Sequence, residues 1–241
     1  MGYKFAAIGL APLLIAQGIY VRRKTPRLPE PLGERSGIDG SGPSLRLLIL
    51  GDSAAAGVGV SAQSQALSGQ LVNALGSDFR VSWKLIARTG NKAKDVAEKL
   101  EMTAPESFDV VVTSVGVNDV THGTKTKKWR DQQGQIIKLL QSKFNSKHII
   151  LSSLPPMHLF PALPQPLRWY LGMRAKRLNG VLKKFAEGCD QCEFAALNLP
   201  LDTAYMAVDG FHPGALAYSF WANHAAAIIR SRLAAASFFK D

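Results

Sequence analysis

Leu47-Leu48-Ile49-Leu50-Gly51-Asp52-Ser53 is a short apolar run that stops at a glycine and is followed by a serine. A continuous apolar run bounded by glycine is typical of a parallel strand that is buried on both faces. The small residues at 54–60 suit a loop at the carboxyl end of that strand. Because open α/β sheets bind their ligands at the carboxyl ends of strands, Ser53 is a candidate functional residue. Taken alone, a serine in this position is more often a turn residue or a helix cap.

Strand-like and helix-like patterns alternate along the rest of the chain. Such alternation predicts a parallel sheet covered by helices on both faces, and hence a three-layer α/β/α sandwich. The predicted strands are residues 45–50, 80–87, 109–115, 148–152 and 193–197. The predicted helices are residues 65–75, 92–100, 128–143, 167–187 and 215–233.

The chain of 241 residues is long enough for one sizeable hydrophobic core. We expect a division into a hydrophobic amino-terminal segment at 1–24, a linker at 25–44 that is rich in Pro, Gly and Ser, and a catalytic domain at 45–241. No internal repeat is evident.

The amino-terminal segment is apolar from residue 5 to residue 21, apart from Gln17, and Arg22, Arg23 and Lys24 follow it at once. This pattern predicts a membrane anchor, with a cleaved signal peptide or a short helix packed on the domain as alternatives. Positive charge is heavier after the segment than before it, so the positive-inside rule places the catalytic domain in the cytoplasm. A periplasmic or secreted domain is the alternative if the segment is a cleaved leader.

The formal net charge of +11 raises nucleic acid or an anionic membrane as a partner. The basic residues are dispersed, and no nucleic-acid-reading motif accompanies them, so we expect no nucleic acid and favour a membrane surface. Cys189 and Cys192 lack a second ligand pair, which makes a structural zinc site improbable. Two free thiols or a local disulfide remain open for this pair.

Four further residues complete a constellation for ester hydrolysis with Ser53. His212, which Pro213 places at a predicted helix start, is the candidate base for the serine proton, and Asp209, three residues earlier, can orient that imidazole. A tetrahedral intermediate then needs donors for its oxyanion, which the backbone N–H groups of Ser53 and Gly90 and the side chain of Asn118 can supply. Each feature alone is more simply a turn residue or a cap, but together they occur in order at strand ends or helix starts.

With these motifs the chain resembles the SGNH hydrolases, also called GDSL-type esterases and lipases. The first block is similar to 51–53, with Ala54 in place of the common leucine, and the Gly-x-Asn-Asp and Asp-x-x-His blocks are similar to 116–119 and 209–212. The oxyanion glycine corresponds to Gly90, in less usual surroundings. The resemblance implies a flavodoxin-like α/β/α fold and a Ser-His-Asp mechanism with no metal or cofactor. The Gly-x-Ser-x-Gly elbow of the α/β-hydrolases is absent.

The substrate is expected to contact an apolar, proline-broken segment at 154–164. Pro156, Met157, Leu159 and Phe160 are the candidate substrate-binding residues, because acyl chains require an apolar wall. A buried connection that packs on the core is the alternative for this segment. The sequence therefore predicts a serine esterase or lipase that acts on acyl esters. A lipid or a lysophospholipid-like ester is the candidate substrate.

Three other enzyme activities and one non-enzymatic role remain open. Acyl transfer or thioester hydrolysis, and carbohydrate O-deacetylation, use the same triad and differ only in the pocket. From a different class, the chain could be a membrane-anchored binding protein without catalysis. However, residues 51–59 match neither of the glycine-rich phosphate-binding patterns.

Overall fold

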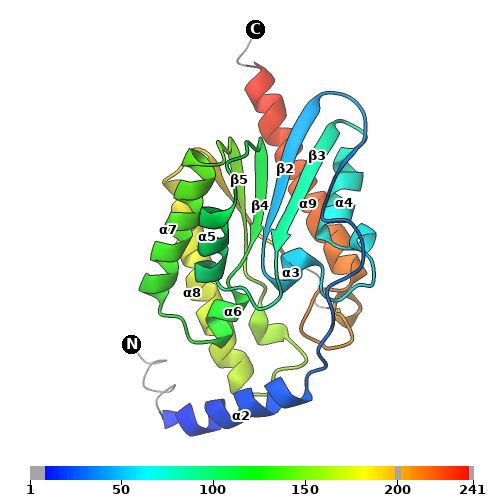
Figure 1. Ribbon diagram of the computed structural model, residues 1–241. Coiled ribbons are helices and arrows are strands. Elements are labelled where there is room, and N and C mark those ends of the chain that lie inside the picture. The colour runs from blue at the N-terminus through cyan, green and yellow to red at the C-terminus, as the bar shows by residue number, and fades with distance from the viewer. Residues whose placement is uncertain (1–8, 199–201, 239–241) are drawn as a thin grey trace.

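The computed structural model describes residues 9–198 and 202–238, and its centre is a six-stranded sheet (Figure 1). The strands lie in the order β1-β3-β2-β4-β5-β6. β1 is antiparallel to β3, and all other neighbours are parallel. The strands are β1 (Ser36–Asp39), β2 (Ser44–Gly51), β3 (Arg80–Ala87), β4 (Val110–Ser114), β5 (His148–Ser152) and β6 (Cys192–Ala195).

Helices cover both faces of this sheet, which confirms the predicted three-layer α/β/α sandwich (Figure 1). All of the predicted strands and helices are present, with ends shifted by a few residues. The α-helices are α2 (Ala11–Lys24), α3 (Ser53–Ala56), α4 (Leu67–Leu75), α5 (Ala93–Met102), α6 (Val117–Thr121), α7 (Thr126–Ser142), α8 (Leu167–Glu187) and α9 (Ala215–Phe238). The 3₁₀ helices among the described residues are η1 (Gln63–Gln65), η2 (Met157–Leu159) and η3 (Thr203–Tyr205).

The apolar run in β2 is continuous because both of its faces are covered. Leu47 and Ile49 belong to the core formed with α4 and α9, whereas Leu48 and Leu50 belong to the core formed with α5, α7 and α8. All four side chains are fully buried. Side chains alternate between the faces of a strand, so a strand between two helical layers needs apolar residues at every position.

Part of the segment expected as a linker is hydrogen-bonded to the sheet. β1 pairs with the outer edge of β3, where Ser36 lies opposite Lys84 and Asp39 opposite Val81. All four residues of β1 are exposed, so the apolar periodicity that identifies a buried strand is missing from its sequence. β1 covers the free edge of β3. The division at residues 24 and 44 stays a prediction.

The amino-terminal helix α2 lies across the end of the molecule at which the parallel strands finish (Figure 1). Its Leu14 is buried against the core, and its Gln17 side chain bonds the backbone of Gln165 and Leu167. In the described part of the chain, no helix combines the length and the apolar character needed to cross a membrane. The predicted hydrophobic segment begins before residue 9, so its first residues lie outside the described ones.

Cys189 and Cys192 are free thiols. The Cys189 sulfur accepts a hydrogen bond from the Gln141 side chain at 3.3 Å. Of the two states that the sequence leaves open for this pair, the structure contains the reduced one.

Replacing Gly51 should destabilise the fold, because an added Cβ would lie 1.9 Å from the Ser114 carbonyl oxygen. Gly51→Ala is expected to lower the free energy of unfolding by about 1–3 kcal/mol or more, since the strands must move apart. Gly180→Ala is the control, because a Cβ there meets nothing within 4 Å and favours the helix by up to ~1 kcal/mol. Urea unfolding measures both, and equal stability of Gly51→Ala and wild type would contradict the expectation.

Candidate active site

The carboxyl ends of three adjacent strands bring the predicted blocks to one edge of the sheet. Gly51, the last residue of β2, is aligned with Ala87 at the end of β3 and with Ser114 at the end of β4. The loops that carry Ser53, Gly90 and Asn118 therefore start side by side. A carboxyl edge between helical layers is where this class of sheet binds ligands.

Ser53, His212 and Asp209 form a continuous hydrogen-bonded chain. His212 Nε2 lies 3.1 Å from Ser53 Oγ, and His212 Nδ1 lies 2.5 Å from Asp209 Oδ2. Ser53 is the first residue of α3, and His212 lies in the turn before α9. These are the three predicted catalytic side chains. The fold brings them together although Ser53 and His212 are 159 residues apart in the sequence. A serine, an imidazole and a carboxylate linked in this order can move a proton off the serine hydroxyl.

The Asp209 carboxylate is held in place from both of its oxygens. Oδ1 accepts hydrogen bonds from the backbone N–H groups of Phe211 and His212, each at 2.9 Å, and Oδ2 faces the imidazole. Burial disfavours its charge, but the hydrogen bonds from His212 and from the two N–H groups outweigh burial and hold the pKa of Asp209 below its usual value. Asp209 is therefore an ionised carboxylate that fixes the imidazole orientation.

Hydrogen bonds tie the Gly90 loop to the Asn118 loop. The Asn118 side-chain amide donates to the Asn91 carbonyl at 3.0 Å, and the Asn91 side-chain amide donates to the Gly51 carbonyl at 3.2 Å. Gly90 has a φ of +87°, a conformation that L side chains rarely adopt. Asn91 thus connects β2 to both neighbouring loops. The sequence analysis did not assign it a role, although it directly follows the glycine.

Asp119 connects the Asn118 loop to the start of α5. Its Oδ2 accepts the backbone N–H of Ala93 at 2.9 Å, which fixes the start of α5 beside the Asn118 loop. Burial raises the pKa of Asp119 despite that hydrogen bond. The acidic residue of the Gly-x-Asn-Asp block is therefore a structural tie between the Asn118 loop and α5, and it is not part of the cavity lining.

Asp52, which directly precedes Ser53 in the sequence, is fully buried. Its Oδ1 accepts the Ala54 backbone N–H at 3.1 Å and caps α3, while Oδ2 has no hydrogen-bond partner among the described residues. Burial raises the pKa of Asp52 to about 7, against smaller opposing effects of the Ala54 N–H, of His212 and of the Gly116 N–H. The protonation state of Asp52 therefore changes close to neutral pH.

A cavity of about 200 Å³ opens beside Ser53 and His212. Its walls are the carboxyl ends of β4 and β5, the segment 152–161 and the segment 202–213. The lining is mainly apolar and includes Leu154, Phe160 and Met206. Apolar cavities with a few polar groups at one end are typical sites for small ligands with an apolar portion.

Three of the four predicted substrate-binding residues line this cavity, and one does not. Pro156, Leu159 and Phe160 are part of the wall. The prediction for Met157 is wrong, because its side chain is fully buried in the core. η2 starts at Met157, so the chain turns there and directs successive side chains to different sides. A proline-broken segment carries no periodicity from which this orientation could be predicted.

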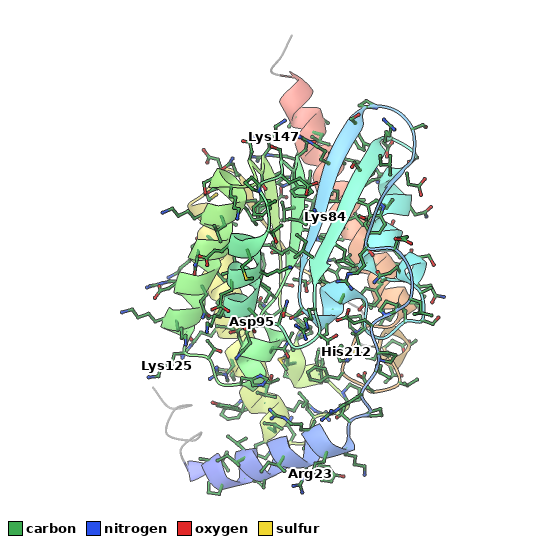
Figure 2. All side chains as sticks on the ribbon, in the orientation of Figure 1. Arg23, Lys84, Asp95, Lys125, Lys147 and His212 are labelled. Atoms are coloured by element: carbon green, nitrogen blue, oxygen red, sulfur yellow. The ribbon has the colours of Figure 1, made fainter. Side chains whose placement is uncertain are left out.

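Phe211 is a site residue that the sequence analysis missed. Its ring lies edge-on to the His212 imidazole, with centroids 5.4 Å apart, and edge-on to Phe160, with centroids 5.2 Å apart. Its position inside the Asp-x-x-His block was the available signal. The two phenylalanines connect the segment after β5 to the catalytic turn, and both line the cavity. Figure 2 shows His212 on the same end of the molecule as α2.

The family of the chain follows from its sequence match. The family model for GDSL-like lipases and acylhydrolases matches residues 49–220, so the chain belongs to this family. No curated protein matches the sequence. The chain is an ester-hydrolysing enzyme, as its family supports.

Solved structures share the fold at low sequence identity. A carbohydrate esterase family 2 enzyme with a carbohydrate-binding domain, from Corynascus thermopiles (Myceliophthora fergusii), has a TM-score of 0.63 at 16% identity, over 80% of this chain and 68% of that one. The psychrotrophic esterase EstA from Pseudoalteromonas sp. has a TM-score of 0.60 at 18% identity, over 79% and 99%. The lipase/acylhydrolase from Enterococcus faecalis has a TM-score of 0.58 at 19% identity, over 78% and 96%.

The burial of Asp52 should make the stability of the protein depend on pH. The pKa of Asp52 is about 7 in the folded protein and has its ordinary value of 3.8 in the unfolded chain, so the folded state binds more protons between these values. The stability contributed by protonated Asp52 is complete below pH 3.8 and is lost as the pH rises to about 7. Between pH 5 and pH 8 the loss is roughly 2–3 kcal/mol.

Asp52→Asn should remove this loss, because an amide cannot ionise but can still accept the Ala54 N–H. Urea unfolding at pH 5 and at pH 8 compares the variant with wild type, and Asp39→Asn controls for the removal of an exposed carboxyl. If wild type and Asp52→Asn lose the same stability between the two pH values, the burial of an unpaired Asp52 carboxyl is not the cause.

Proposed function

We propose that the protein is a serine esterase that hydrolyses esters of apolar acyl groups through Ser53, His212 and Asp209. The single observation that carries the proposal is the hydrogen-bonded chain from Ser53 Oγ through His212 to Asp209, with an apolar cavity beside the serine. Membership of the GDSL-like lipase/acylhydrolase family supports the reaction type.

In the first half of the reaction, Ser53 Oγ attacks the ester carbonyl carbon while His212 Nε2 takes the hydroxyl proton. The carbonyl oxygen becomes an oxyanion, for which the backbone N–H groups of Ser53 and Gly90 and the Asn118 side-chain amide are the proposed donors. The tetrahedral intermediate collapses when His212 returns the proton to the leaving alcohol. An acyl ester on Ser53 remains.

In the second half, water replaces the alcohol. His212 takes a proton from the water as it attacks the acyl carbonyl, and then returns that proton to Ser53 Oγ as the acid leaves. Throughout, the Asp209 carboxylate keeps the Nδ1–H tautomer of the imidazole and stabilises its protonated form. The hydrogen bond from Asn118 to the Asn91 carbonyl uses one amide hydrogen, so the second remains for the oxyanion.

The cavity supports an acyl group of medium length as the preferred substrate part. The cavity of about 200 Å³ leaves room for several methylene groups beyond the ester carbonyl. Its walls offer apolar side chains along most of their length. A lipid or lysophospholipid-like ester fits these properties.

Carbohydrate O-deacetylation is the second candidate function, because the structural neighbours include a carbohydrate esterase family 2 enzyme and an acetylxylan esterase from Geobacillus stearothermophilus. At 16% identity each of these two neighbours supports the fold alone. Acyl transfer and thioester hydrolysis use the same catalytic groups and differ in the acceptor or leaving group. An acetyl group would leave most of the apolar cavity unfilled, so the cavity favours longer acyl groups.

Removing the serine hydroxyl should abolish hydrolysis. Ser53→Ala is expected to lower kcat on p-nitrophenyl butyrate by roughly 10⁴-fold or more, because the nucleophile is lost. Ser61→Ala removes a hydroxyl from an exposed loop residue and is the matched control. A fluorophosphonate probe should label wild type and Ser61→Ala but not Ser53→Ala. Undiminished hydrolysis or labelling in Ser53→Ala would refute the assignment, and tight ligand binding without any hydrolysis would favour the binding-only role.

The acyl preference should follow the cavity. On p-nitrophenyl esters, kcat/KM is expected to rise about threefold to fourfold per methylene from acetate until the cavity is filled. Met206→Trp narrows the cavity wall and should lower kcat/KM for octanoate by at least about tenfold while acetate changes little. Met102→Trp, at an exposed helix end, is the control. A preference for acetate over all longer chains would favour the deacetylase alternative.

A further inference from the structure

The side of α2 that faces away from the rest of the protein is apolar. Leu13, Ile15, Ile19 and Tyr20 are between 46% and 62% exposed. From residue 12 to residue 20, the only polar side-chain groups are the Gln17 amide and the Tyr20 hydroxyl. Surface helices of globular proteins normally present charged and polar residues to water. The outer face of α2 therefore has the composition of a surface that is covered.

The inner side of α2 is already used for packing on the protein. Leu14 is buried, and Gln17 donates to the Gln165 carbonyl at 2.7 Å and accepts the Leu167 N–H at 3.0 Å. Since Gln17 is held in this way, α2 cannot turn its outer face inward without breaking both hydrogen bonds. The outer face of α2 is therefore free of packing contacts within the described structure and is available to a partner.

The charges next to this face indicate an anionic partner. Arg22, Arg23 and Lys24 form the last turn of α2, and no acidic residue precedes Glu30 in the sequence. Residues 132–186, which include most of α8, also contain no acidic residue. In Figure 2 the Arg23 side chain points away from the protein. An exposed apolar helix face beside a cluster of basic residues is the composition of helices that lie in the interface of an anionic bilayer.

The location of α2 relates this face to the active site. α2 lies across the end of the molecule at which the parallel strands finish, and His212 lies at the same end (Figures 1 and 2). The segment between β5 and α8 contributes Leu159 and Phe160 to the cavity wall and then reaches Gln165, which bonds α2. Leu159 is itself 38% exposed at this wall.

We propose that the outer face of α2 docks on an anionic lipid bilayer, with Leu13, Ile15 and Ile19 in the acyl-chain region and the basic last turn at the lipid phosphates. Docking in this way brings the active-site end of the enzyme to the bilayer, from which an acyl ester can enter the cavity. The docking of α2 on a bilayer does not depend on the proposed esterase function. The delivery of substrate from the bilayer does depend on that function.

Vesicle sedimentation with the full-length protein tests the docking. Wild type is expected to sediment with vesicles made of equal parts phosphatidylcholine and phosphatidylserine, less with phosphatidylcholine alone, and less as salt screens the charges. Arg22→Gln/Arg23→Gln/Lys24→Gln should weaken binding by about 100-fold, because each basic residue near an anionic surface contributes about fivefold. Ile15→Ser/Ile19→Ser should weaken it by at least about tenfold.

Matched controls alter the same properties elsewhere on the surface. Arg80→Gln/Lys99→Gln/Lys147→Gln removes three positive charges from the end at which the strands begin, and Ile38→Ser/Met102→Ser removes two exposed apolar side chains. Both controls should keep vesicle binding within about twofold of wild type, since surface substitutions of this kind disturb the fold little. Hydrolysis of soluble p-nitrophenyl butyrate by every variant checks that the fold is intact.

Each outcome has a defined meaning. Loss of vesicle binding in both α2 variants, with binding kept in both controls and soluble-ester hydrolysis unchanged in all, supports the proposal. No binding by wild type, or α2 variants that bind as the controls do, overturns it. A concentration-dependent dimer of wild type that Ile15→Ser/Ile19→Ser abolishes, without vesicle binding, assigns the face to a second copy and also overturns it. Vesicle binding without ester hydrolysis by wild type refutes the proposed function alone.

Discussion

The lack of a side chain at Gly51 determines how closely the ends of β2 and β4 approach each other. The space that a Cβ would need is occupied by the Ser114 carbonyl oxygen, and that oxygen accepts the Asp52 N–H at 2.9 Å. The Gly51 carbonyl in turn accepts the Asn91 side chain. One glycine thus lets the strand end bond to both neighbouring strand ends, and Ser53 starts its helix from this fixed point.

The carboxyl groups of Asp209 and Asp52, near Ser53, have different electrostatic environments. Their pKa values and therefore their charges at neutral pH differ. Asp209 receives two backbone N–H groups and the imidazole, so its pKa is lowered and it stays charged beside His212. Asp52 is more deeply buried and faces no imidazole of the described structure at hydrogen-bond distance, so burial outweighs its backbone hydrogen bonds and raises its pKa to about 7. Below that pH the imidazole faces one negative charge instead of two. Pairs of acidic groups whose environments separate their pKa values are typical of catalytic sites.

Sequence reasoning could predict those parts of the fold whose side chains repeat with a regular period. β2 and β3 are identified by apolar or alternating runs, and the Ser53, Asp209 and His212 side chains are identified by motifs at strand ends or helix starts. β1 has no such period, because all four of its residues are exposed at a sheet edge. In the proline-broken segment, Met157 turns into the core while Leu159 faces the cavity, and this choice depends on the packing of η2 against α8. Local patterns do not contain that information.

The same packing connects the amino-terminal helix to the cavity. A Cβ at Gly172 in α8 would lie 2.6 Å from the His158 side chain, so η2 and α8 are in direct contact at this glycine. Gln17 of α2 bonds the backbone at the start of α8, one helix turn from where η2 packs. Leu159 and Phe160 in the cavity wall therefore lie between α8 and the turn that carries Phe211 and His212. Gln17 of α2 is hydrogen-bonded to the start of α8. The described contacts therefore link α2 to the cavity wall through α8 and η2, without any contact between α2 and the catalytic residues themselves.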